Sequence, residues 1–128
     1  MAKFAHANVL DNGLNYIKNN CTKIALISSY SVGESYATVA AKILAEATMT
    51  PTDFTLASSG NNRTLTSAAG KQDTSANATG GSATNHIAFL NTTGSEVLWV
   101  TEETSGQVVT VGNPVNFPSL VYTSNQPT

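Results

Sequence analysis

The chain has 128 residues, of which 41% are apolar and 11% are charged, and its formal net charge is −2. This length is typical of one domain, and a single core can form at it without disulfides or metals. The weak negative charge gives no electrostatic reason to expect nucleic-acid binding. No apolar run approaches the length of a membrane span. We therefore expect one domain, residues 1–128, without nucleic-acid or membrane partners.

Small uncharged polar residues dominate the rest of the composition. The sequence holds 18 Thr, 13 Ser and 13 Asn, which together make 44 of its 128 residues. Thr favours pleated surfaces, whereas Asn and Ser favour turns. The composition therefore favours a β fold.

The few charges are unevenly distributed. Residues 1–71 carry all six bases and four acids, whereas residues 72–128 carry four acids and no base. Chance in a sparsely charged chain accounts for this asymmetry. The alternative is a molecule with two unlike ends, one of which faces a partner.

Residues 8–19 carry the clearest helical pattern. Leu10, Leu14 and Ile17 recur at helical spacing and form one apolar stripe. Asn8 is suited to cap the N-terminus. Gly13 in the interior costs about 1 kcal/mol relative to alanine, so packing must hold this helix. Residues 1–7 are expected to form an N-terminal arm.

The segment after the helix predicts a buried strand at residues 22–28, because it is a short apolar run with β-branched residues. Residues 36–49 are ambiguous. Their alanine content is typical of a helix, but Val39 and Ile43 fit an irregular stretch that leads into a strand near residues 43–49.

Residues 50–122 have a consistent β pattern, so we assign residues 22–122 to one β domain. Strands are expected at residues 53–57 and 63–68, and an edge strand or loop at 71–78. The best hairpin joins residues 85–90 to 96–101 through a five-residue loop containing Gly94. Its pattern places Ile87, Phe89, Leu98 and Val100 on one face, and Val97 and Trp99 on the other.

A second hairpin is expected through residues 102–106 into a strand at 107–111. A last strand at residues 115–122 contains Pro118, which places it at a sheet edge or at a bulge. Residues 123–128 predict a mobile polar tail. Short strands separated by Gly and Asn turns predict an antiparallel β-sandwich or small barrel, jelly-roll-like, with a short N-terminal helix.

No pattern of catalytic or metal-binding residues stands out. His6 and His86 have no carboxylate or Cys at ligand spacing, and we expect a solvated and a structural histidine respectively. Cys21 is alone, and a small buried residue is a better interpretation than a nucleophile. Adjacent Glu102 and Glu103 point apart on a strand or tight loop. We expect a protein that is not an enzyme and holds no metal or cofactor.

The chain ends are the candidate interface. Phe4 and His6 lie in the arm, outside any expected element, and Phe117, Leu120 and Tyr122 flank Pro118 on an expected edge strand. Stray aromatics and open edges are what a monomer normally hides. We therefore expect a dimer or trimer, or docking on a partner, through these residues.

Two stretches resemble a family of small uncharacterised proteins encoded among the structural genes of tailed phages. Residues 10–29 follow its LD-x-x-L-x-Y-I-x-x-N helix and the strand after it, and residues 111–120 follow its G-N-x-V-N-F-P run. The runs DFTL at 53–56, R-x-L-T at 63–66 and HIAF at 86–89 are also similar, so the resemblance spans most of the chain.

This resemblance names no active site. It implies a virion protein made in the host bacterial cytoplasm and placed on the capsid surface, such as a decoration or cement protein that binds the major capsid protein as a homo-oligomer. A tail or neck component of the same particle is the alternative. A carbohydrate-binding adhesin module is a third reading, for which exposed aromatics should cluster.

Overall fold

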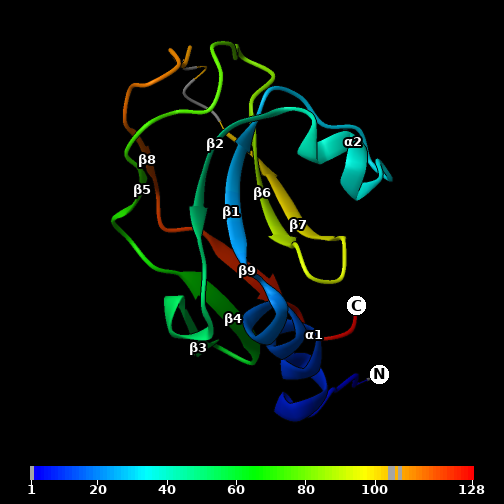
Figure 1. Ribbon diagram of the computed structural model, residues 1–128. Helices are drawn as coiled ribbons and strands as arrows, with labels where there is room; N and C mark the ends of the chain where they lie inside the picture. Colours follow the sequence, from blue (N-terminus) through cyan, green and yellow to red (C-terminus); the bar gives the residue numbers. More distant parts are fainter. Residues whose placement is uncertain (1, 104–105, 107) are drawn as a thin grey trace.

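The computed structural model describes residues 2–103, 106 and 108–128, and it confirms a mainly β fold with antiparallel sheets and a short N-terminal helix (Figure 1). The largest sheet has the strand order β2-β1-β6-β7, with β1 (Lys23–Ile27), β2 (Ile43–Thr48), β6 (His86–Asn91) and β7 (Glu96–Glu102). A second sheet has the order β3-β4-β9, with β3 (Phe54–Ser59), β4 (Asn62–Ser67) and β9 (Val121–Ser124). A ribbon pairs β5 (Lys71–Asp73) with β8 (Val115–Phe117).

Helix α1 (Ala7–Asn20) buries Leu10, Leu14 and Ile17, as the spacing predicts. It extends one residue beyond the expected range at each end. Its N-cap is His6 and not Asn8, because the His6 Nδ1 accepts the Asn8 backbone N–H at 3.1 Å. The helix packs on the β3-β4-β9 sheet, so tertiary contacts hold an element that is too short to persist alone.

The four-stranded sheet is covered on both faces. One face meets α1, the three-stranded sheet and the β5-β8 ribbon in the main core, around residues such as Ile24, Phe89 and Leu65. The other face, with Ala25, Ile27, Ala88 and Leu90, packs beneath Val39 of the short helix α2 (Tyr36–Ala40). Two apolar faces explain why β1 and β6 are apolar along almost their whole length.

Residues 36–49 contain both of the structures that compete in the sequence. The five-residue helix α2 begins after Ser35, whose side chain accepts the Thr38 N–H, and β2 follows from Ile43. The expected strand near 43–49 is therefore confirmed, and the helical content is limited to Tyr36–Ala40. The one-turn 3-10 helix η1 (Pro51–Asp53) leads on into β3.

The expected hairpin between β6 and β7 is present. Ile87, Phe89 and Leu98 share a face opposite Val97, as predicted, but Trp99 and Val100 lie on the faces opposite to those predicted. The pairing shifts between Phe89 and Leu90, and Phe89 lies opposite Trp99. The two rings stack on one face at 4.3 Å, nearly parallel at 8°. Val97 and Val100 pack on the opposite face, in the cluster beneath α2. A β-bulge of this kind reverses the alternation of side chains on one strand.

The last expected strand is in fact two strands in different sheets. The chain leaves β8 at Phe117, passes Pro118, and joins β4 as β9. Residues 119–120 make the crossing, where the Leu120 N–H donates to the Ser67 hydroxyl oxygen at 2.9 Å. The proline falls where the backbone leaves one partner for the next, which suits a residue without an N–H.

Two further expectations are corrected. Residues 123–128 do not form a free tail, because β9 continues to Ser124 and Gln126 is hydrogen bonded to two other segments, the arm and the β3-β4 turn. The expected strand at 107–111 is reduced to a single bridge between Val109 and Gly80. The turn predicted for it includes residues 104 and 105, which lie outside the described residues, as does 107.

Candidate interaction surface at the chain ends

The two ends of the chain lie together at one end of the molecule, beside α1 (Figure 1). Gln126 joins them. Its Oε1 accepts the Ala5 backbone N–H at 2.8 Å, and its Nε2 donates to the Ala5 carbonyl at 2.9 Å. The same Nε2 donates to the Asn61 carbonyl, and the Gln126 backbone N–H donates to the Asn62 side chain. One side chain thus fixes the arm, the C-terminal segment and the β3-β4 turn.

The arm presents a large apolar side chain to solvent. Phe4 is 75% exposed. His6 is also exposed, and it caps α1 through Nδ1. Lys3 Nζ donates to Thr128 O, a second tie between the chain ends. The arm is therefore tied to the C-terminal residues at Lys3 and Ala5, and Phe4 projects between these two ties.

Of the candidate residues near Pro118, the structure separates one from the others. Phe117 is only 3% exposed and belongs to the main core, so its assignment to the interface is wrong. It alternates with exposed Asn116 along β8, which turns Phe117 inward. Leu120 is partly buried against the core. Tyr122 is 40% exposed, and its ring meets the edge of Trp99 at 5.3 Å.

A groove of about 440 Å³ lies between α1, β7 and β9. Helix α1 contributes Gly13 and Tyr16 to its lining, β7 contributes Glu96 and Leu98, and β9 contributes Tyr122. The Tyr16 hydroxyl donates to the Glu96 carboxylate, at 2.7 and 2.9 Å from its two oxygens, and links the helix to the sheet edge. This shared hydrogen bond is the main reason why the Tyr16 pKa is raised and the Glu96 pKa is lowered.

The groove follows two open strand edges. Strands β7 and β9 are each last in their sheets, and the hydrogen bonds of the described residues leave their outer backbone edges uncovered. The opposite edge of the four-stranded sheet is covered. There the Glu46 N–H donates to the Asp73 carboxylate at 2.8 Å, and the Leu44 carbonyl accepts from Asn77 at 2.7 Å. An uncovered edge is a template for a further strand.

Sequence reasoning missed the exposed side of α1. Val9 is 64% exposed and Tyr16 is 48% exposed, and exposed Gly13 lies between them at helical spacing. These three positions form a second stripe beside the buried one. Their spacing could have revealed that stripe, because an apolar helix surface wider than the buried stripe leaves part of it for another partner.

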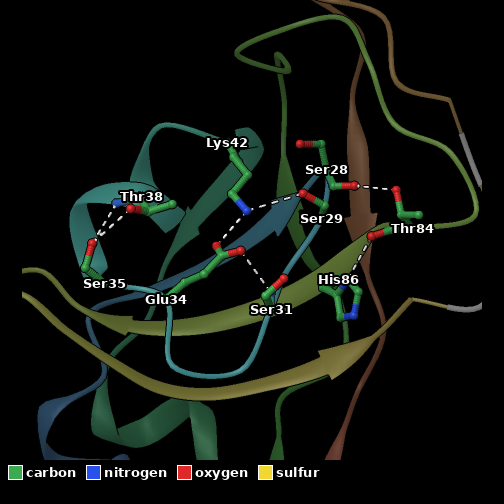
Figure 2. A network of polar contacts seen from close by, with 9 residues as sticks. All are labelled: Ser28, Ser29, Ser31, Glu34, Ser35, Thr38, Lys42, Thr84 and His86. Carbon is green, nitrogen blue, oxygen red and sulfur yellow. Dashed lines mark hydrogen bonds and ion pairs between the residues drawn. The ribbon is translucent and has the colours of Figure 1, made fainter.

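A polar network at the other end of the four-stranded sheet has a structural role (Figure 2). Lys42 pairs with Glu34 at 2.6 Å and donates to the Ser29 hydroxyl at 3.3 Å. The second Glu34 oxygen accepts the Ser31 backbone N–H. Hydrogen bonding to Lys42 is the main reason why the Glu34 pKa is lowered. These contacts fasten the loop between β1 and α2 to the start of β2.

His86 lies at the margin of that network, at the start of β6. Its Nδ1 lies 2.7 Å from the Thr84 carbonyl, and its ring is tilted against Tyr30 at 6.1 Å. The Thr84 hydroxyl in turn donates to the Ser28 carbonyl (Figure 2). The Nδ1 atom meets a backbone carbonyl and not a hydroxyl, so this contact is not a nucleophile-base pair.

A second hollow, of about 510 Å³, is lined by charged residues that already have partners. Lys23 pairs with Glu46 at 3.0 Å across β1 and β2. Lys71 pairs with Asp53 at 3.2 Å, and the Asp73 carboxylate accepts the Glu46 N–H. This hollow is therefore the outer side of the covered sheet edge.

Cys21 is 2% exposed, and burial raises the pKa of its thiol to about 11. The expectation of a small buried residue is confirmed. Within the described ranges, no three His, Cys, Asp or Glu side chains are grouped so as to hold a metal ion. No helix among those residues is long and apolar enough to cross a membrane.

Comparison with known proteins identifies no relative of this chain. No protein-family model, curated protein or solved structure matches the chain.

Proposed function

We propose that this chain is a non-enzymatic structural protein of a tailed-phage virion, a decoration or cement protein that binds the lattice of the major capsid protein and stabilises the head. It acts on the capsid surface as a homo-oligomer. The resemblance of residues 10–29 and 111–120 to proteins encoded among phage structural genes supports the assignment to a phage particle.

The observation that carries the proposal is the apolar surface at the chain ends. Phe4, Val9, Tyr16 and Tyr122 are each at least 40% exposed, and the groove beside two of them follows two uncovered strand edges. Exposed apolar side chains around an open edge favour contact with another protein. A small domain that clamps neighbouring subunits needs such a surface more than it needs a reactive site.

The rest of the molecule suits a passive role in a particle. The core needs no disulfide, since Cys21 is the one cysteine of the chain, and both faces of the main sheet are buried. Among the described residues, four ion pairs join different segments of the chain, such as α1 with β4 and β1 with β2. These features support a domain that persists outside a cell.

The test is co-sedimentation of the purified chain with empty heads of the source phage, and separately with its tails. We expect saturable binding to heads at a fixed ratio to the major capsid protein, and heads that resist heat better when decorated. Binding to tails alone would move the protein to the tail or neck. Binding to neither would overturn the proposal.

A carbohydrate-binding module is the second candidate, and one observation favours it. Tyr16 and Tyr122 line the same groove, beside the Glu96 carboxylate. Aromatic rings and a carboxylate are groups that bind sugar rings and hydroxyls. A glycan array at micromolar protein concentration tests it, with Tyr122→Ala as the variant that should lose any signal.

A further inference from the structure

The groove between α1, β7 and β9 has an apolar lining that can bind a segment of another chain. Its lining includes the buried Leu14 and Ile17, the partly exposed Leu98 and the exposed Tyr122. Backbone groups of the β7 and β9 edges are open along it. Apolar walls beside an open edge suit an extended peptide with a large apolar side chain.

Gly13 is an independent sign of close approach. A glycine in a helix interior is destabilising relative to alanine. An added Cβ at Gly13 would meet nothing within 4 Å inside the molecule, so internal packing gives no reason for the glycine. Because Gly13 lines the groove, its missing side chain leaves room for a backbone that lies against α1.

The N-terminal arm of the chain carries an exposed apolar side chain of the kind that the groove can bind. Residues 2–6 form neither helix nor strand, and Phe4 projects from them with 75% of its surface exposed. In its own chain Phe4 borders a different hollow, beside Arg63 and Gln126, and does not line the groove. Gln126 is hydrogen bonded to both the N–H and the carbonyl of Ala5, so the backbone next to Phe4 is fixed before any contact forms.

The charges of the two surfaces are complementary. Among the described residues, Glu96 is the one charged residue that lines the groove. Its pKa is lowered by hydrogen bonds from Tyr16 and Asn91, so it is a carboxylate near neutral pH. Lys3 precedes Phe4 in the arm and is exposed, and its ammonium, which donates to Thr128 O of its own chain, keeps two further hydrogens for a partner. An ammonium one residue from an apolar anchor matches a carboxylate at the rim of an apolar groove.

We propose that the groove binds the arm of a second copy of this chain, with Phe4 seated between Leu98 and Tyr122 and with Lys3 beside Glu96. The contact joins two unlike surfaces, the arm of one copy and the groove of the other. The proposal deepens the proposed function, since it rests on the self-association named there and specifies its surface.

Two variants disable the two surfaces separately. Phe4→Ala removes the anchor but keeps the groove. Gly13→Arg keeps the anchor but fills the groove and places a cation beside Glu96, and the open space at Gly13 lets the chain fold. We expect the wild type to be an oligomer by light scattering. Each variant should raise the dissociation constant at least about tenfold, as expected for loss of a buried aromatic anchor.

Mixing the two variants distinguishes this contact from any other. The arm of Gly13→Arg still fits the groove of Phe4→Ala, so an equimolar mixture should form a heterodimer that neither variant forms alone, detected by native mass spectrometry. Asn12→Arg is the matched control, because Asn12 is exposed on α1 outside the groove. It should associate like the wild type.

Three results would overturn the proposal: a wild type that is monomeric at every concentration, variants that associate like the wild type, or a mixture without the heterodimer. A glycan or another protein that fills the groove while the wild type stays monomeric would give the first result. The head-binding assay is separate. A chain that binds heads without this contact would refute the inference alone, and a chain that oligomerises through it without binding heads would refute the proposed function alone.

Discussion

Phe89 is the side chain on which the two sheets of the core meet. It is fully buried, stacks on Trp99 at 4.3 Å, and lies tilted against Phe54 of the other sheet at 6.0 Å. Trp99 covers it from a strand whose residues are only partly buried. The two aromatic residues therefore differ in what their removal costs.

We predict that Phe89→Ala lowers the free energy of unfolding by about 3–5 kcal/mol, because the cavity forms where sheet and sheet are in contact. Trp99→Ala should cost less, since part of that ring is already solvated. Chemical denaturation followed by circular dichroism measures both. Val32→Ala, at a side chain that is 98% exposed, is the control and should leave stability unchanged. A Phe89→Ala variant as stable as this control would show that the register of the hairpin is wrong.

Cys21 makes stability depend on pH in the alkaline range. Burial raises its pKa from 9.0 to about 11 in the folded chain. The unfolded thiol loses its proton at lower pH, so the unfolded state is favoured progressively as pH rises from about 9 to about 11. The stabilising contribution is complete below this window and is lost across it.

We predict that the free energy of unfolding of the wild type falls more steeply between pH 9 and 11 than that of Cys21→Ala. The upper bound on the difference in slope is about 1.4 kcal/mol per pH unit for one group. Tyr16, whose pKa is also raised, is common to both proteins and cancels in the comparison. Parallel curves would contradict the assignment of a buried thiol to this position.

At the scale of elements, two glycines differ in whether the fold requires them. An added Cβ at Gly13 in α1 meets open space, whereas one at Gly94, between β6 and β7, would lie 2.8 Å from the Asn91 amide nitrogen. That amide donates to Glu96 and accepts the Gly94 N–H through its oxygen. The turn therefore needs its glycine, and the helix does not.

We predict that Gly13→Ala stabilises the monomer by up to about 1 kcal/mol, because alanine restricts the unfolded chain and meets no obstacle in the helix. Gly94→Ala should destabilise it. Thermal unfolding at concentrations below self-association measures both, and the opposite signs are the result that matters. A destabilising Gly13→Ala would mean that α1 packs more closely at this position than the structure places it.

The sequence predicts well those elements whose apolar residues follow a regular pattern along the chain. The buried stripe of α1 and the apolar runs of β1 and β6 each follow from a repeat in the chain. The bulge at Phe89 and the crossing from β8 to β9 have no such repeat. They depend on which strand lies opposite, and that is decided by long-range pairing.

The candidate site was predicted in part for the same reason. Phe4 and Tyr122 are exposed, but Phe117 faces the core because Lys71 of β5 pairs with it from a distant part of the chain. Val9 and Tyr16 were missed because a helix stripe that is apolar and exposed looks, in sequence, like part of a buried one.

At the scale of the whole molecule, the uneven charge of the chain has a structural basis. The four acids of residues 1–71 all pair with bases of the same segment, in the pairs Lys23–Glu46, Lys42–Glu34, Arg63–Asp11 and Lys71–Asp53. The two bases that remain are Lys18, which donates to backbone carbonyls, and Lys3 in the arm. The positive excess of the first half therefore includes a lysine at the chain ends, where the interaction surface lies.

Gln126 decides whether the two chain ends behave as one unit. It supplies both hydrogen bonds to the Ala5 backbone and a third to the Asn61 carbonyl, while Lys3 makes the other tie between the chain ends, to Thr128 O. Gln126→Ala should free residues 3–6 without unfolding the sheets, because these bonds lie outside both core clusters. The ¹⁵N order parameters of these residues should fall from about 0.85 to below about 0.6, with a thermal midpoint within a few degrees of the wild type.

Gln72→Ala, which removes an exposed side-chain bond to Asn116, is the control and should leave the arm rigid. Unchanged order parameters in Gln126→Ala would mean that something other than this side chain holds the arm, and the ordered projection of Phe4 would need another cause.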